Sequence, residues 1–250
     1  TWLERGMNRQ SRGVAPCVLI EIWSDVVCPW CYIGKRNLEA ALADFAHADE
    51  VEVRWRAFEL DPQAPAAREG DYAGRLARKY GTGRGEAQAM IDRMTATAAE
   101  VGLDFRFDRA RPGNTFDAHR LLHLAAERGV QDNLKERFLL ATFTEGEPIS
   151  DHGTLARLAA QVGLDADEVV AVLAGDAYGA EVRADERLAA QLDVTGVPFF
   201  VVDGRYALPG AQPPDLLLRV LERARDEAHR QAMVVGGEIA AGCDGDACEV

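Results

Sequence analysis

The sequence lacks any apolar run close to the roughly 20 residues that a membrane-spanning helix requires. It is also poor in positive charge, because 28 Lys and Arg stand against 41 Asp and Glu and give a net charge of −13. Such an acidic surface repels nucleic acids and anionic membranes, so neither is expected as a partner. Residues 1–13 have no apolar core and no small-residue cleavage site, which predicts that they are not a secretory signal and that the protein is cytoplasmic.

Cysteine is scarce as well, with five residues in 250. Stable disulfides are uncommon in the cytosol, so these cysteines are expected to be reactive thiols rather than a disulfide scaffold. A structural zinc site needs four ligands, and no second closely spaced pair follows Cys28 and Cys31 in the core of the chain. We therefore expect no metal and no bound cofactor.

Residues 28–31 read Cys-Pro-Trp-Cys and stand where a strand pattern ends and a helical pattern begins. Backbone N–H groups and the helix dipole at such a position stabilise a thiolate, the form of cysteine that attacks disulfides. Pro29 suits the first helical turn because its missing N–H would have no partner there. Two intervening residues let Cys31 return to Cys28, so the pattern predicts a two-electron redox pair whose potential Pro29 and Trp30 tune.

Hydrophobic periodicity predicts a strand, a helix over 28–45 and a second strand at the start of the chain. Seven helical segments follow, over 72–80, 88–101, 116–127, 134–143, 155–162, 165–173 and 176–192. Two strands joined by an Asp203-Gly204 hairpin and a last helix over 216–232 complete the pattern. The predicted units are an α/β domain of residues 18–60 and 193–232, an inserted helical domain of residues 61–192, and a Gly-rich tail of residues 233–250.

This order of elements, with a cysteine pair opening the first helix, resembles the thioredoxin fold, and the helical insertion resembles the DsbA branch of that fold. Four stretches within residues 19–232 are similar to FrnE-type DsbA-like thiol–disulfide oxidoreductases, in the order of that family. They are Ile22–Gly34 (IWSDVVCPWCYIG), Gly113–Leu121 (GNTFDAHRL), Val194–Phe200 (VTGVPFF) and Gly210–Pro214 (GAQPP). The resemblance implies an α/β thioredoxin fold with a large all-helical insertion.

The resemblance also implies roles for individual residues. The Val197–Pro198 peptide bond should be cis and face the cysteine pair, so that the backbone of Val197 pairs with an extended substrate. The residues alone leave open an ordinary proline at the start of an edge strand. Cys28 should be the attacking sulfur, and Cys31 the resolving sulfur, buried one turn later.

Asn114 precedes a helical pattern, where it or Thr115 is expected to act as the cap. In related glutathione-using proteins this region approaches the substrate thiol, which makes Asn114 a candidate substrate contact. His119 and His123 lie one turn apart, but no third ligand is evident, so we expect buried or capping roles rather than a metal site.

Cys243 and Cys248 lie in the Gly-rich tail, separated by four residues. Neighbouring acidic residues should raise the pKa of both thiols and make them poorer nucleophiles. The pair is either incidental or a second redox pair that exchanges electrons with Cys28 and Cys31. Some FrnE-type proteins carry a similar tail, and this resemblance is consistent with the second interpretation.

Residues and resemblance together predict a thiol–disulfide oxidoreductase, or protein-disulfide isomerase, that acts on protein dithiols and disulfides, with glutathione as a candidate redox partner. One alternative is a glutathione-dependent isomerase or transferase of the kappa or 2-hydroxychromene-2-carboxylate isomerase type. Another is a redox-regulated holdase. The isomerase chemistry needs only a group that stabilises the glutathione thiolate, typically a serine in place of Cys28, so two cysteines favour redox chemistry.

Overall fold

The computed structural model describes residues 18–68 and 70–240. Their elements are β1 (Val18–Ser24), α2 (Pro29–Asp44), β2 (Val51–Ala57), α3 (Tyr72–Tyr80), α4 (Arg84–Glu100), α5 (Phe116–Glu127), α6 (Gln131–Leu140), α7 (His152–Gln161), α8 (Ala166–Ala174), α9 (Gly179–Gln191), β3 (Phe199–Val202), β4 (Tyr206–Pro209) and α10 (Pro214–Ala240). None of the helices in these ranges combines the length and apolarity needed to cross a membrane.

The four strands form one mixed sheet in the order β2-β1-β3-β4. β1 and β2 are parallel, and α2 provides the crossover that parallel neighbours require. β3 pairs with β1 and with β4 in antiparallel fashion. Asp203 and Gly204, with φ of 51° and 65°, form the turn between β3 and β4, as the hairpin signal predicts.

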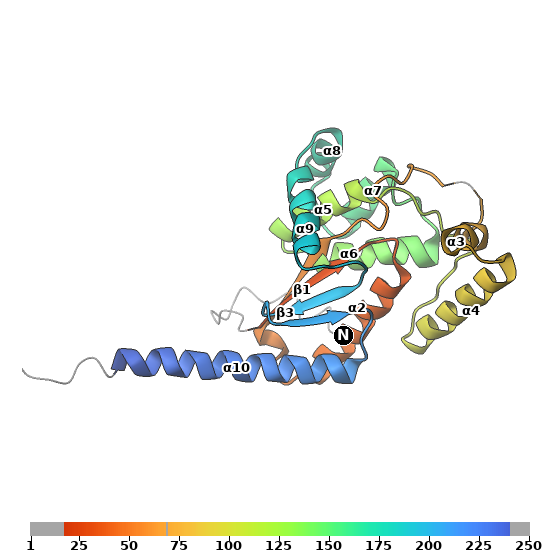
Figure 1. The fold of residues 1–250 in the computed structure, drawn as a ribbon. Helices are drawn as coiled ribbons and strands as arrows, with labels where there is room; N and C mark the ends of the chain where they lie inside the picture. Colours follow the sequence, from red (N-terminus) through yellow and green to blue (C-terminus); the bar gives the residue numbers. More distant parts are fainter. Residues whose placement is uncertain (1–17, 69, 241–250) are drawn as a thin grey trace, which may run out of the picture.

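The two faces of the sheet are covered by different helices (Figure 1). Ile20 and Ile22 of β1 point to the face where α2 and α10 lie side by side, and they pack against Leu42 and Leu217. Trp23 points to the other face, where it packs against Ala189 of α9. The alternation follows from the two-residue period of a strand, and it buries both faces.

Helices α3–α9 lie between β2 and β3 in the chain and form two further cores. The first core packs the four helices α5, α6, α7 and α8 together. Its buried residues include Leu121, Phe138, Leu155 and Val169. The second is rich in aromatic rings and fixes α3 and α4 against the start of α2; its members include Tyr32, Ile91, Phe105, Phe107 and Phe143. The helical insertion therefore packs directly against the turn of α2 that follows the cysteine pair.

The predicted thioredoxin fold with a helical insertion is confirmed, but several element bounds were wrong. α4 begins at Arg84 because Gly83 is its N-cap, a position that favours glycine, so the glycine run starts this helix. α6 begins at Gln131 and ends at Leu140, and a π-helical turn over Ala141–Glu145 follows it. α9 begins only at Gly179, because Tyr178 adopts a left-handed φ of 63°.

Candidate active site

Cys28 occupies the N-cap of α2, and Pro29 is the first residue of that helix, as the sequence predicts. Both cysteines are free thiols; Cys28 is 4% exposed and Cys31 is fully buried. The amide of Cys31 donates to the carbonyl of Cys28 at 3.1 Å, which turns the chain so that the two sulfurs lie together. Trp30, between them, is 45% exposed and lies at the surface.

The segment before β3 faces the cysteine pair. Because β1 and β3 are neighbours and Trp23 pairs with Phe199, the last residues of β1 and the first residues of β3 lie at the same end of the sheet. The Val197–Pro198 bond is cis, which confirms that prediction. The Cys28 sulfur donates to the carbonyl of Val197 at 3.4 Å. Cys28, Cys31, Val197 and Pro198 are therefore brought together although 166 residues separate Cys31 from Val197.

The pKa values of the two thiols are shifted in opposite directions. The hydrogen bond with Cys31, together with burial, raises the pKa of Cys28 well above its ordinary value. Burial also opposes the ionisation of Cys31, but the hydrogen bond from Cys28 and the charge of Lys135 lower the pKa of that thiol. The role of Cys28 as the attacking sulfur stays a prediction. The Val197 carbonyl favours a protonated Cys28, whereas a cation lies behind Cys31.

Lys135 of α6 supplies that cation. Its side chain is fully buried, its Nζ donates to the carbonyl of Ser24 at 3.3 Å, and it lies 5.4 Å from the ring centre of Trp55. Burial lowers the pKa of Lys135 to about 8, while the negative charges of Cys31 and Asp25 act in the opposite direction. A buried ammonium next to a buried thiol favours the thiolate.

Asp25 follows β1 and contacts the loop that carries Cys28, whose amide donates to its carbonyl at 3.2 Å. Its carboxylate accepts a hydrogen bond from the Leu60 amide at 2.8 Å and lies 3.4 Å from Nε2 of His119. Burial disfavours the charge of Asp25, but the hydrogen bond and charge of His119 and the Leu60 amide hold its pKa below the ordinary value. Asp25 is thus a buried carboxylate that opposes ionisation of Cys28.

The two histidines of α5 face different carboxylates. His119 faces Asp25, whereas Nε2 of His123 lies 3.1 Å from Asp185 of α9. Within residues 18–68 and 70–240, no group of three or more His, Cys, Asp and Glu is arranged to hold a metal ion.

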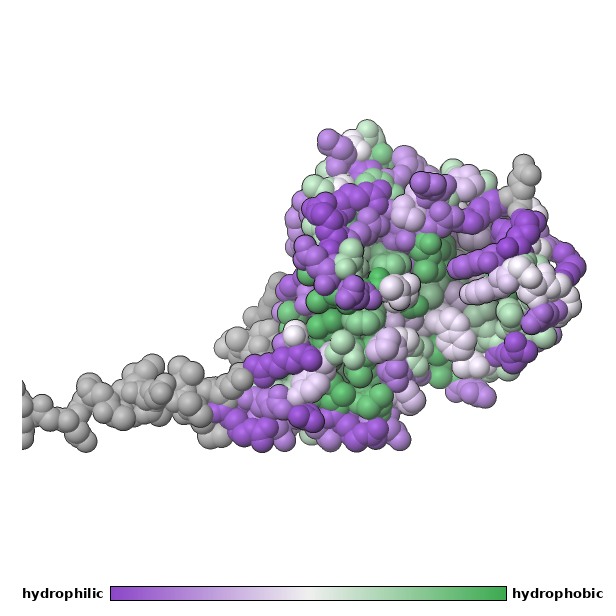
Figure 2. Space-filling view, viewed as in Figure 1, coloured by the Kyte–Doolittle hydropathy of each residue, from purple (hydrophilic) through white to green (hydrophobic). Residues whose placement is uncertain are grey.

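The surface around these elements is largely apolar. Figure 2 shows hydrophobic residues gathered over the middle of the view, where the sheet and α2 lie in Figure 1, with hydrophilic residues above and below.

A model of the DSBA-like thioredoxin domain matches residues 19–222. The chain belongs to this family.

Similar proteins agree with the DsbA-like assignment. The uncharacterized protein YwbO of Bacillus subtilis is 30% identical over 206 residues, which cover 82% of this chain and 96% of that protein. A probable DsbA oxidoreductase from Streptomyces coelicolor has a crystal structure that is 48% identical, with a TM-score of 0.80, covering 84% of this chain and 91% of that one. The cytosolic disulfide reductase DsbM from Pseudomonas aeruginosa shares the fold, at 21% identity and a TM-score of 0.58, over 82% and 97% of the two chains.

Asn114 lies in the loop that precedes α5 and forms hydrogen bonds through its side chain. Its side-chain oxygen accepts from the amide of Phe116 at 2.9 Å, so Asn114 rather than Thr115 supplies the side-chain cap of α5. Its side-chain nitrogen donates to the carbonyl of Pro62 at 3.3 Å. A substrate contact by Asn114 stays a prediction. Cys243 and Cys248 lie outside the described residues.

Sequence reasoning missed Lys135, Asp25 and His119 as parts of the site. Asp25 stands only three residues before Cys28, so its proximity was available from the sequence. Lys135 has no such signal, because a lysine in an amphipathic helix is ordinarily a solvent-exposed residue. Only the packing of α6 against β2 brings it beneath the cysteines.

Gly34 provides a test of the packing around Pro198. A Cβ at Gly34 would lie 3.0 Å from Cγ of Pro198 and 3.4 Å from the ring of Phe200. We expect Gly34→Ala to lower the free energy of unfolding by about 1–3 kcal/mol, as overpacking does, and to slow disulfide exchange by displacing Pro198. Urea unfolding and insulin reduction measure the two effects.

Gly85→Ala is the matched control for that substitution. Gly85 lies in the first turn of α4, and a Cβ there would meet nothing within 4 Å. This variant should be neutral or slightly more stable, since alanine favours a helix over glycine. Equal effects of the two substitutions would contradict close packing at Gly34.

Proposed function

We propose that the chain exchanges disulfides with protein substrates through Cys28 and Cys31. The observation that carries the proposal is the pair of hydrogen-bonded free thiols at the start of α2, with the carbonyl of Val197 beside Cys28. A thiolate next to an exposed backbone edge suits attack on a disulfide in an extended polypeptide.

The reaction begins with the loss of one proton from the pair. When the pair has lost one proton and the other lies on Cys31, the Cys28 thiolate attacks a substrate disulfide. A mixed disulfide forms at Cys28, and one substrate sulfur leaves as a thiolate. Cys31 passes its proton to the substrate thiolate that has left and attacks Cys28, which releases the second substrate thiolate. Two electrons pass from the dithiol to the substrate, and the reverse sequence oxidises a substrate dithiol.

Four further residues are assigned to substrate binding and tuning. The backbone of Val197 pairs with the substrate strand, since its carbonyl already reaches the sulfur of Cys28. Pro198 packs beside it against Gly34. Exposed Trp30 offers an apolar contact to a partner at the point of exchange, and with Pro29 it sets the environment of the sulfurs.

We extend the proposal to the setting of the reaction. A cytoplasmic location, glutathione as redox partner, isomerase activity and membership of the FrnE-type subgroup belong to this proposal and rest on the sequence arguments above. The glutathione-dependent isomerase alternative needs no resolving thiol, so the pairing of Cys31 with Cys28 supports exchange chemistry over it.

The function can be tested by trapping its intermediate. In Cys31→Ser, Cys28 should still attack a protein disulfide, but the neighbouring thiol that resolves the mixed disulfide is gone, so a covalent adduct accumulates. Non-reducing electrophoresis and mass spectrometry of the mixture with scrambled ribonuclease, whose disulfides are mispaired, should show one adduct per chain that dithiothreitol removes.

The control is the double variant Cys28→Ser and Cys31→Ser, which should form no adduct through this site. An adduct that maps to neither residue of the pair, or the absence of any adduct with Cys31→Ser alone, would overturn the assignment of Cys28 as the attacking sulfur.

A further inference from the structure

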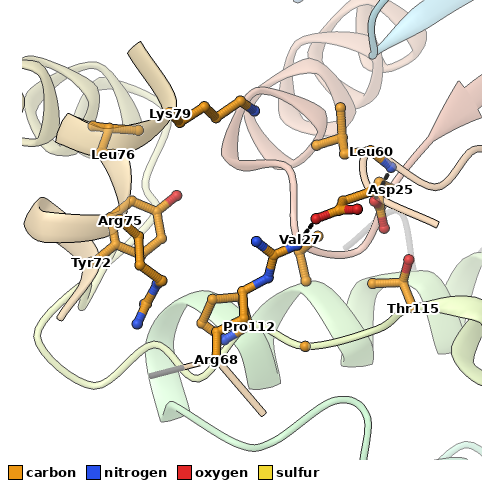
Figure 3. A pocket seen from close by; sticks show the side chains of 12 residues that line it. Asp25, Val27, Leu60, Arg68, Tyr72, Arg75, Leu76, Lys79, Pro112 and Thr115 are labelled. Carbon is orange, nitrogen blue, oxygen red and sulfur yellow. Dashed lines mark hydrogen bonds and ion pairs between the residues drawn. The ribbon is translucent and has the colours of Figure 1, made fainter. Parts of the chain in front are cut away.

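A cavity of about 300 Å³ opens beside the loop that leads into Cys28. Asp25 and Val27 of that loop form one wall, and Tyr72, Arg75 and Lys79 of α3 form the opposite wall (Figure 3). Val27 directly precedes the attacking cysteine in the chain. A group bound in this cavity therefore lies next to the site of sulfur exchange.

The α3 wall is strongly basic in a chain whose net charge is −13. Arg68, Arg75 and Lys79 line this cavity and also a second, more open one that Arg78 borders. Figure 3 shows Lys79 reaching from α3 towards Leu60, across the opening. The basic residues thus form a continuous surface over both cavities.

The carboxylates at this cavity already have partners. Asp61 forms an ion pair with Arg68. Asp25 accepts from the Leu60 amide and faces His119, and it is only 1% exposed. Neither carboxylate is therefore available to neutralise the α3 cations.

Arg75 and Lys79 lack an ion pair with any carboxylate among the residues that the structure describes. Arg75 donates to the carbonyl of Gly70 and lies over the ring of Tyr72, and one of its terminal nitrogens is buried without a hydrogen-bond partner. Lys79 Nζ lies 5.7 Å from the ring centre of Tyr80. Burial, with the positive charges of Arg68 and Arg78, lowers the pKa of Arg75.

Two like charges four residues apart on a helix destabilise it unless an anion lies between them. Elsewhere in the described chain, buried or half-buried cations such as Lys35, Arg36 and Arg56 pair with carboxylates of the protein. The Tyr72 hydroxyl stays protonated, because burial and the nearby Cys28 raise its pKa, so it adds a hydrogen-bond donor to this wall. The cavity thus presents hydrogen-bond donors and positive charge, while the two carboxylates that line it already have partners.

We propose that this basic cavity binds a carboxylate of the substrate beside the disulfide that Cys28 attacks, so that the preferred substrates are peptide disulfides flanked by carboxylates. Arg75 and Lys79 hold the carboxylate, and Tyr72 donates a hydrogen bond to it. The inference rests on the proposed function. In the reaction, the Cys28–substrate bond forms as the substrate disulfide breaks, and Cys31 completes the two-electron transfer from the protein dithiol.

The test is a single-turnover measurement with the reduced protein and two small disulfides. Glutathione disulfide carries carboxylates, and hydroxyethyl disulfide carries no charge. Tryptophan fluorescence follows the oxidation of the pair and gives a rate constant for each. We expect the ratio of these constants, glutathione over hydroxyethyl disulfide, to fall about tenfold in the double variant Arg75→Gln and Lys79→Gln, because two charge-assisted contacts are lost.

The double variant Arg187→Gln and Arg219→Gln is the matched control. It removes the same charge from exposed positions on α9 and α10, away from both cavities. Its ratio should stay within about twofold of wild type, and so exclude a general effect of net charge. Disulfide-linked peptides with aspartates beside the cysteine form a third arm. If glutathione disulfide loses more rate in the Arg75 and Lys79 variant, the cavity binds the carboxylate of a small molecule. If the aspartate peptides lose more, it binds a carboxylate of a polypeptide.

The two proposals fail in different ways. If neither disulfide oxidises the Cys28–Cys31 pair, the proposed function is wrong. If both react but the ratio is unchanged in the Arg75 and Lys79 variant, or changes equally in the control, the carboxylate site is wrong while exchange through Cys28 stands.

Discussion

Cys28→Ser is expected to lower the rate of disulfide exchange by a factor on the order of a hundred or more. A serine hydroxyl stays protonated at neutral pH and is a far weaker nucleophile than a thiolate. Cys31 cannot replace it, because its side chain is fully buried and no substrate sulfur can reach it in line. Insulin reduction measured by turbidity, with dithiothreitol as the reductant, gives the rates.

The controls for this variant separate chemistry from folding. Serine is close in size to cysteine, and Cys28 is an N-cap, a position where serine is favoured, so urea unfolding should show little change in stability. Full activity in a folded Cys28→Ser protein would contradict the redox assignment of this pair. Cys243 and Cys248 would then be the next cysteines to replace.

Local signals explain what the sequence could predict. The break between strand and helix places Cys28 at the start of α2, and Pro29 marks the first turn. Gly81 and Gly102 end the predicted helices before them with positive φ, as glycines at these positions do. Asp151 and Asp165 cap α7 and α8 through their side chains. Each of these features depends on residues within one turn.

The features that were missed depend on packing across the chain. The hydrogen bond with Cys31 and burial raise the pKa of Cys28, and Lys135, which is distant from the pair in the sequence, helps to lower the pKa of Cys31. The helix dipole, by contrast, acts locally, and it favours the thiolate form of Cys28. The basic cavity likewise needs α3 to lie opposite the loop of Asp25 and Val27. A periodic pattern indicates that a helix exists but not which loop it faces.

Lys135→Met is expected to raise the free energy of unfolding at pH 7, even though it removes a residue of the site. Burial lowers the pKa of Lys135 from 10.5 to about 8. Below pH 8 the lysine is charged in both states, and the depressed pKa costs the folded state about 3 kcal/mol. Methionine removes that cost but leaves the Ser24 carbonyl without its donor, so the net gain is smaller. Urea unfolding measures it.

The dependence on pH gives the sign of this effect. Between pH 8 and 10.5 the folded protein loses the Lys135 proton while the unfolded chain keeps it, so wild-type stability should rise with pH relative to Lys135→Met. Above pH 10.5 the lysine is neutral in both states and the cost disappears. The advantage of methionine should therefore shrink from pH 8 upwards. If the stability difference between Lys135→Met and wild type stays constant or grows from pH 8 upwards, the lowered pKa of Lys135 is contradicted.

Lys35→Met is the matched control, because Lys35 is also buried but has carboxylate partners. Lys35 lies 3.3 Å from Asp132 and 3.2 Å from Glu136, and although burial disfavours its charge, these carboxylates raise its pKa above the ordinary value. Removing one partner of a buried ion pair costs about 3–5 kcal/mol. The two lysine variants should thus change stability in opposite directions.

Lys135→Met should also change the redox properties of the cysteine pair, which would explain why the protein keeps a lysine that lowers its stability. Without the charge of Lys135, the pKa of the Cys31 thiol should rise, which the absorbance of the thiolate measures. A less stable thiolate means a less stable reduced form, so the reduction potential of the pair should fall against glutathione, by about 30 mV for each tenfold change in the equilibrium constant. If Lys135→Met gains stability while its thiol pKa and potential stay at the wild-type values, then Lys135 does not act on the sulfurs. A gain in stability accompanied by a lower potential would show that the folded state carries this buried charge in order to make its disulfide a stronger oxidant.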